Sequence, residues 1–195
     1  MSQVFSEDGT VSVVTVLEAT PNVVTQVKTI DSDGYNAVQV GVGTRKEKNL
    51  SKAVKGHLKG VGSFTELREF RLDSAPELKV GDKVAADTFA VGDDVSVSAI
   101  TKGRGFQGVV KRHGFHGGPR SHGQKHSERE PGSIGGGLRT RVPKGMRMAG
   151  RMGGNRVTVS GLHIVGVSAD ASKILVSGAI PGKRGTVVEI RSAAK

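Results

Sequence analysis

The glycine-rich segment at residues 103–108 is the first candidate for chemistry in this chain. Its sequence, GRGFQG, satisfies the G-x-G-x-x-G pattern of dinucleotide-binding turns, and Glu128 follows about 20 residues later. Such a site needs a helix after the glycines, because the helix N-terminus receives the pyrophosphate. Residues 109–123 show no apolar helical period and contain five Gly or Pro residues. The pattern therefore favours a backbone that lies close to a phosphate chain over a nucleotide site.

Four histidines follow in the same part of the chain and suggest a second kind of site. They are His113, His116, His122 and His126. Their spacing would suit zinc if a helix presented them on one face, but glycines and a proline interrupt the segment. Neighbouring lysines and arginines also disfavour a bound cation. We therefore expect no metal site and no cofactor, and imidazoles that stack on RNA bases or bind 2′-hydroxyl groups.

Carboxylates offer no catalytic pair in this region. Glu128 and Glu130 are the only acidic residues between positions 102 and 156, and they are two residues apart. An acid–base pair needs a scaffold that builds a cleft around the substrate, which this segment does not predict. We predict that the protein is not an enzyme and has no small-molecule substrate. The glycine pattern and the histidines are the only features in favour of catalysis.

Composition excludes further classes of protein. The chain has no cysteine, which excludes disulfide scaffolds, thiolate metal sites and cysteine nucleophiles. No apolar run approaches the roughly 20 residues that a membrane helix needs. The first residues, MSQVFSEDGT, lack the pattern of a secretory signal. We therefore predict a cytoplasmic protein without a membrane partner.

Charge is distributed very unevenly along the 195 residues. The chain has 29 Lys and Arg against 18 Asp and Glu, a net charge of +11, and residues 102–156 hold 13 of the basic and two of the acidic residues. This segment therefore carries the whole excess. Nine of its 13 cations are arginines, whose planar guanidinium groups suit phosphate. If six to ten of them contact phosphates, the affinity should fall by about 10³ to 10⁵ between 50 and 200 mM salt.

The same segment is also unsuited to folding by itself. Residues 102–156 hold 15 of the 29 glycines and only 11 apolar residues. Burial of so little apolar surface cannot offset the entropy lost on ordering. We expect an extension that is mobile alone and becomes ordered on a partner. A disordered linker is the alternative, although linkers are usually rich in Ser, Pro or Glu rather than Arg.

We predict that the basic and imidazole side chains of the extension bind RNA. They are Lys102, Arg104, Lys111, Arg112, His113, His116, Arg120, His122, Lys125, His126, Arg129, Arg139, Arg141, Lys144, Arg147, Arg151 and Arg156. Larger apolar side chains such as Phe106 and Phe115 are too sparse for a core. We expect them to act as anchors in RNA grooves or against the rest of the protein.

The flanking residues, 1–101 and 157–195, carry no net charge and predict a β-rich body. Only residues 51–59 resemble a helix, with Ser51 as its N-cap. Short strands without helices between them indicate a mainly β protein, built as an antiparallel barrel or sandwich. The strands are predicted from β-branched alternation and turn residues at 11–18, 23–30, 37–42, around Phe70 and Leu72, and at 94–100, 157–159, 162–167, 174–176 and 186–190.

Three segments of the extension resemble one known family. Residues 102–112 (KGRGFQGVVKR), 129–135 (REPGSIG) and 144–153 (KGMRMAGRMG) closely resemble the bacterial form of large-subunit ribosomal protein L3. Residues 23–28 and 33–40 of the body resemble the same family in order and spacing. Arg151 departs from the pattern, because many relatives carry glutamine at this position.

The resemblance implies a translation-protein-like antiparallel β-barrel that forms one domain over residues 1–195. Its body would comprise residues 1–101 and 157–195, and residues 102–156 would be the internal extension. The family binds 23S rRNA, with the extension directed toward the peptidyl-transferase centre, supports early assembly of the large subunit, and contacts ribosomal proteins L14 and L19. A free RNA chaperone or architectural nucleic-acid-binding protein, which the same charge asymmetry would suit, is the alternative.

Overall fold

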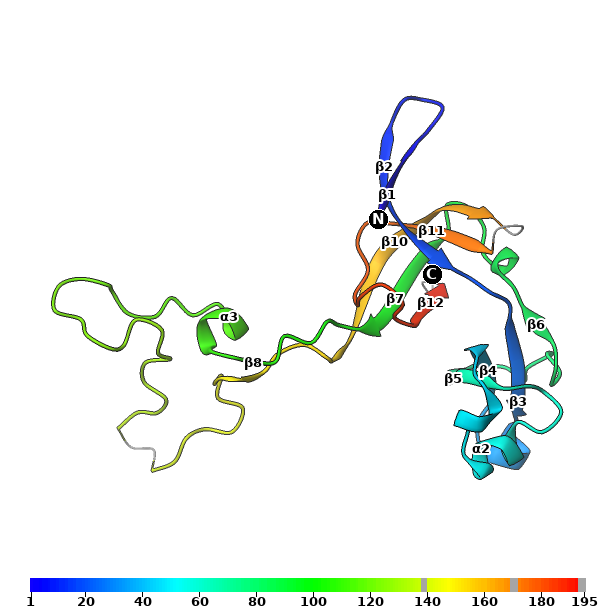
Figure 1. Ribbon diagram of the computed structural model, residues 1–195, viewed down its shortest axis with the longest axis horizontal. Coiled ribbons are helices and arrows are strands. Elements are labelled where there is room, and N and C mark those ends of the chain that lie inside the picture. Colours follow the sequence, from blue (N-terminus) through cyan, green and yellow to red (C-terminus); the bar gives the residue numbers. More distant parts are fainter. Residues whose placement is uncertain (138–139, 169–171, 193–195) are drawn as a thin grey trace. The chain divides into compact units, whose positions relative to one another are not determined.

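The computed structural model describes residues 1–137, 140–168 and 172–192 (Figure 1). Strands predominate and helices are few, as predicted. The chain divides into two compact units, of which the first comprises Met1–Val95, Gly161–Ala179 and Ser192–Lys195 and the second Ser96–Ser160 and Ile180–Arg191. The prediction of a single domain over residues 1–195 stays a prediction.

Twelve strands and three α-helices occur among the described residues. The strands are β1 (Ser2–Phe5), β2 (Val11–Glu18), β3 (Asn22–Lys28), β4 (Ala37–Thr44), β5 (Phe64–Arg71), β6 (Lys83–Val84), β7 (Asp94–Ile100), β8 (Phe106–Gln107), β9 (Gly150–Arg151), β10 (Arg156–Ser168), β11 (Lys173–Ser177) and β12 (Val188–Ser192). The helices are α1 (Ile30–Asp33), α2 (Lys52–His57) and α3 (Val109–His113), with short 3₁₀ turns η1 (Glu47–Asn49) and η2 (Ala86–Thr88).

The larger sheet has six strands in the order β1-β2-β11-β10-β7-β12. The pairs β1–β2, β2–β11 and β10–β11 are antiparallel. Val14, Ile164, Ile174 and Val176 are almost completely buried on these strands, because β-branched side chains pack well on a pleated surface. Among the described residues the sheet does not close on itself, so the predicted barrel stays a prediction.

The smaller sheet has the order β5-β4-β3-β6 and a core of its own. Val24, Val38 and Val40 are buried there, and Val27, Phe70 and Val84 pack against them. Antiparallel pairing of β4 with both β3 and β5 places these side chains together. This sheet positions helix α2, which follows β4 in the chain.

Helix α2 confirms the predicted helical region, and Ser51 caps it as expected. The Ser51 hydroxyl accepts a hydrogen bond from the Val54 backbone N–H at 3.4 Å. The prediction of one helical region was wrong, because α1 and α3 are helices as well. Both are single turns that end at a glycine in the left-handed conformation, Gly34 (φ 81°) and Gly114 (φ 72°). Such turns are set by their C-caps and show no apolar period.

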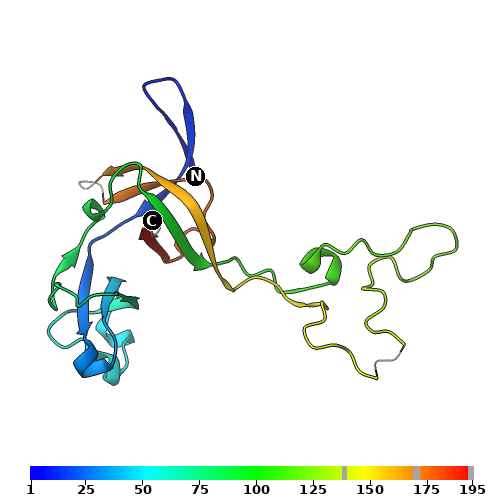
Figure 2. The ribbon, with the colours of Figure 1, turned by 180° about the vertical axis from the view of Figure 1, so that it is seen from behind.

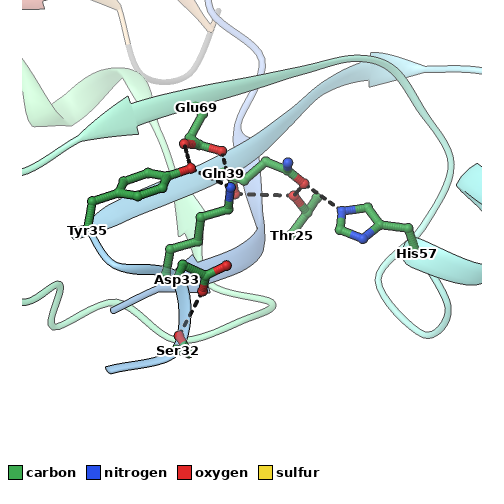
Figure 3. A network of polar contacts seen from close by, with 8 residues as sticks. Thr25, Ser32, Asp33, Tyr35, Gln39, His57 and Glu69 are labelled. Atoms are coloured by element: carbon green, nitrogen blue, oxygen red, sulfur yellow. Dashed lines mark hydrogen bonds and ion pairs between the residues drawn. The ribbon is translucent and has the colours of Figure 1, made fainter. Parts of the chain in front are cut away.

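An ion pair with two further hydrogen bonds joins strands β3 and β5 of the smaller sheet (Figure 3). The ammonium group of Lys28 lies 2.7 Å from a Glu69 carboxylate oxygen and donates a hydrogen bond to the Tyr35 hydroxyl at 2.7 Å. Tyr35 in turn donates to Glu69 at 2.7 Å. These hydrogen bonds raise the pKa of Lys28, and the bonds from Lys28 and Tyr35 lower the pKa of Glu69 below its ordinary value.

We expect Glu69→Gln to lower the midpoint of thermal unfolding by about 2–4 °C near neutral pH, because the charged partner of Lys28 is lost. The pKa of Glu69 is lower in the folded state than in the unfolded state. The Glu69 carboxylate therefore stabilises the folded protein fully above the unfolded pKa of about 4.3. This stabilisation is lost as the pH falls through the lower pKa of the folded state. The difference between variant and parent should therefore disappear in strong acid. Melting curves followed by circular dichroism across this pH range provide the measurement.

Glu66→Gln is the matched control on the same strand. Glu66 pairs with Arg68 across two residues of β5, and both side chains are about two-fifths exposed. An exposed pair of this kind contributes little to stability. A Glu69→Gln variant that melts like Glu66→Gln near neutral pH, or that keeps its deficit in strong acid, would contradict the expectation.

Candidate nucleic-acid interface

The extension begins and ends in a paired stem within the second unit (Figures 1 and 2). The Thr101 N–H donates to the carbonyl of Asn155 at 2.9 Å, and the Arg104 N–H donates to that of Met152 at 2.8 Å. The Met152 N–H donates to Gly105 at 2.9 Å, and the antiparallel pair β8–β9 continues the ladder. Residues 102–156 were expected to be mobile alone and to become ordered on a partner, which stays a prediction. The base of the extension nevertheless has a backbone ladder of its own, because backbone pairing needs no apolar core.

Glycine permits the close approach of the two chains in the stem. A Cβ atom at Gly153 would lie 2.0 Å from the Lys102 carbonyl oxygen, and Gly153 has a φ of 77°. Farther along the extension, a Cβ at Gly117 would lie 1.9 Å from the Glu128 carbonyl oxygen. At these two positions glycine is needed because the backbone meets another part of the same chain. By contrast, no atom lies near the Cβ position of Gly103, Gly105 or Gly108.

Helix α3 follows the G-x-G-x-x-G segment, contrary to the sequence prediction. It has only five residues, and Val109 is its one buried residue. The helix is held against the returning chain, because Arg112 donates from Nη1 to the Met148 carbonyl at 2.6 Å and His113 donates from Nε2 to the same carbonyl at 3.0 Å. Its last turn is wholly basic, which the carbonyl end of a helix favours.

Beyond α3 the chain surrounds an open hollow of about 650 Å³. Phe115 lies at its edge with the Arg147 guanidinium 5.1 Å from its ring centre and the His113 ring 6.0 Å away. His116 and Glu130 also line the hollow. Cationic and aromatic groups thus converge on one concave surface, as in sites that accept nucleotides.

The structure distributes the predicted RNA-binding residues over the whole extension. The stem carries Lys102, Arg104, Arg151 and Arg156, and helix α3 carries Lys111, Arg112 and His113. The outer loops carry His116, Arg120, His122, Lys125, His126, Arg129, Arg141, Lys144 and Arg147, and Arg139 lies outside the described residues. Arg112 and His113 are half-buried, and the others of this described set are exposed.

Two of these cations are already paired with carboxylates. Arg120 donates from Nε to Glu128 at 2.6 Å, and Arg156 is paired with Glu189 of β12. The other described Lys and Arg residues of the extension form no ion pair with a described carboxylate. The exposed ones are therefore available for phosphate, whereas Arg112, which donates to the Met148 carbonyl, and Arg156 are less available than the sequence suggested.

Phe106 is the most exposed aromatic side chain of the extension, at 76%. It lies directly opposite Arg151 in the β8–β9 pair. Directly opposite residues on antiparallel strands share a face, so this face of the stem offers both an exposed aromatic ring and an exposed guanidinium. This combination is typical of surfaces on which nucleobases stack.

Neither a metal centre nor a membrane helix is found in the described ranges. No group of three or more His, Cys, Asp or Glu residues described by the structure could hold a metal ion. Among the same residues, no helix is both long and apolar enough to cross a membrane.

Two comparisons with known proteins agree with the resemblance of the extension. The family model described as "Ribosomal protein L3" matches residues 58–173, which is more than half of the chain. A curated relative from Syntrophobacter fumaroxidans, "Large ribosomal subunit protein uL3", is 46% identical over 194 residues, covering 98% of this chain and 92% of the relative. The chain therefore belongs to the ribosomal protein L3 family.

Proposed function

We propose that this protein is a structural constituent of the large ribosomal subunit and binds 23S rRNA through residues 102–156. The observation that carries the proposal is the set of exposed cations without carboxylate partners along the extension. In a member of the L3 family, such a set is suited to neutralise the phosphates of rRNA. The protein would accordingly be located in cytoplasmic ribosomes and would not be an enzyme.

The paired stem supports this role physically. Its backbone ladder presents Arg104 and Arg151 from an ordered segment, which lowers the entropy lost on binding. Phe106 adds an exposed ring for a nucleobase, and the outer loops add further cations. The rest of the extension would become ordered only among nucleotides.

The finer features of the proposal follow from the family. Residues 1–101 and 157–195 would form the body, a β-barrel of the translation-protein type, and act with the extension as one domain. The extension would be directed toward the peptidyl-transferase centre. The protein would support early subunit assembly and contact ribosomal proteins L14 and L19. Continuity of strands β7 and β10 across the boundaries of the two compact units supports a single domain.

Sedimentation of the natural protein in a gentle lysate tests the proposal. We expect it to travel with the large subunit in a sucrose gradient at moderate salt and to leave that position after ribonuclease treatment. A free RNA chaperone would instead remain near the top of the gradient, in both treated and untreated samples. That outcome would overturn the ribosomal assignment and favour the alternative.

A further inference from the structure

A second cluster of positive charge lies outside the extension, at residues 45–59. This segment holds six Lys and Arg residues and one acidic residue, Glu47. The remainder of residues 1–101 and 157–195 has ten basic and 15 acidic residues. The body has no net charge only when all of its residues are counted together. Residues 45–59 carry a net charge of +5, and the other body residues are acidic overall.

The segment is held firmly on the smaller sheet. His57 at the end of α2 donates from Nε2 to the Gln39 side-chain oxygen at 2.7 Å, and Thr25 donates to the same oxygen at 2.9 Å (Figure 3). Leu58 is 3% exposed, and the Arg45 N–H donates to the Ser63 carbonyl at 3.1 Å. The cluster is therefore presented by an ordered platform.

An open hollow of about 400 Å³ joins the two halves of this segment. Glu47 and Leu50 line it from the η1 side, and Lys55, Lys59 and Ser63 line it from the α2 side. All six cations of residues 45–59 are exposed, and none forms an ion pair with a described carboxylate. Lys55 and Lys59 thus direct their charge to the concavity, and the other four cations direct theirs to solvent on the same segment.

The cluster gathers positive charge with little compensation. Its six cations lie close together along the chain with one acidic residue, Glu47, among them, and like charges this close repel each other. Lys52 lies in the first turn of α2, where the helix dipole disfavours a cation, whereas Lys55 lies in the last turn, where a cation is favoured. A polyanionic partner would offset the repulsion.

We propose that residues 45–59 form a second RNA-binding surface that contacts the phosphate backbone separately from the extension. The inference goes beyond the proposed function, which uses residues 102–156 alone. A membrane is a poor fit, because α2 has six residues and the apolar Val54 and Leu58 are half-buried and buried, whereas membrane-surface helices expose an apolar face. A protein partner is disfavoured because the cluster lacks aromatic anchors.

The test uses the full chain with Lys48, Lys52, Lys55 and Lys59 replaced by glutamine. Binding to deproteinised large-subunit rRNA is measured over a series of salt concentrations. We expect the slope of log affinity against log salt to fall by about 3, because each phosphate contact contributes about 0.7 to 0.9. Hydroxyl-radical footprinting should lose one protected region and keep those of the extension. Replacement of the same lysines by arginine should retain the slope.

A matched control replaces four exposed lysines elsewhere outside the extension: Lys79, Lys83, Lys173 and Lys183. It changes the net charge equally and should leave the slope nearly unchanged. Equal losses in both variants, or an unchanged slope in the first, would overturn the proposal. So would unchanged rRNA binding accompanied by loss of binding to phosphatidylserine vesicles, which would assign the cluster to a membrane.

The outcome is distinct from that of the proposed function. If the proposed function is wrong, substitutions in residues 102–156 will leave rRNA binding unchanged while the cluster at residues 45–59 is intact. If the cluster does not bind RNA, only the variant with Lys48, Lys52, Lys55 and Lys59 replaced by glutamine will show it, by an unchanged salt slope. Circular dichroism of each variant shows whether the fold is retained, and the melting temperature should change little, because all four lysines are exposed.

Discussion

Replacing Arg104, Arg141 and Arg151 together by glutamine should lower the affinity for large-subunit rRNA by about 10² to 10³-fold at 0.1 M salt. All three side chains are exposed, and none is paired with a described carboxylate. Each phosphate contact contributes about 0.7 to 0.9 to the slope of log affinity against log salt, so this slope should fall by about 2 to 3. Filter binding or fluorescence anisotropy over a salt series measures both quantities.

The control separates specific contacts from net charge. A variant with Lys79, Lys83 and Lys173 replaced by glutamine loses the same charge from exposed positions outside the extension. Its salt slope should remain close to that of the parent. If both variants lost affinity to the same extent, the extension would have no special role in binding. The proposed function would then lack its main support.

The fold could be predicted where local sequence decides it. Strands β2 and β7 have the predicted bounds, because β-branched residues alternate with polar ones between clear turn signals. Residues 157–159 and 162–167 were predicted as two strands and form the single strand β10, which continues through Gly161 at a φ of 71°. A glycine in a β-branched segment suggests that the strand ends there, although a glycine can also allow one continuous strand to bend.

The short strands β8 and β9 could not be predicted. Each has two residues, lies in a polar segment without alternation, and pairs with a distant part of the chain. Their pairing depends on the close backbone approach at Gly153, which is a property of the folded chain. Non-local backbone pairing of this kind leaves no periodic signal in the sequence.

The position of the candidate site could be predicted from charge composition, but the availability of its individual residues could not. The charge count identified residues 102–156, but the pairing of Arg156 with Glu189 joins residues far apart in sequence. The cluster at residues 45–59 was missed, because the charge was summed over the whole body and acidic residues elsewhere cancelled it. Charge counted in a window of about 15 residues would have found it.

Gly153→Ala should open the stem of the extension. The new Cβ would lie 2.0 Å from the Lys102 carbonyl oxygen, on a residue whose φ of 77° already disfavours a side chain. Left-handed backbone costs about 1–2 kcal/mol, and each hydrogen bond lost with the ladder costs about 1 kcal/mol more. We expect hydrogen–deuterium exchange at the Arg104 and Met152 amides to become at least about 30-fold faster, since about 1.4 kcal/mol corresponds to a factor of ten.

Gly145→Ala is the control that separates the effect of the close contact with the Lys102 carbonyl from the effect of the backbone conformation. Gly145 lies in the same extension with a φ of 78°, yet no atom is within 4 Å of its Cβ position. It therefore bears the same conformational cost without the contact, and exchange at the Arg104 and Met152 amides should remain close to that of the parent. Equal acceleration by both variants would mean that the stem is not held by close packing. If the stem must close for RNA to bind, only Gly153→Ala should weaken rRNA binding, because affinity falls with the fraction of competent molecules.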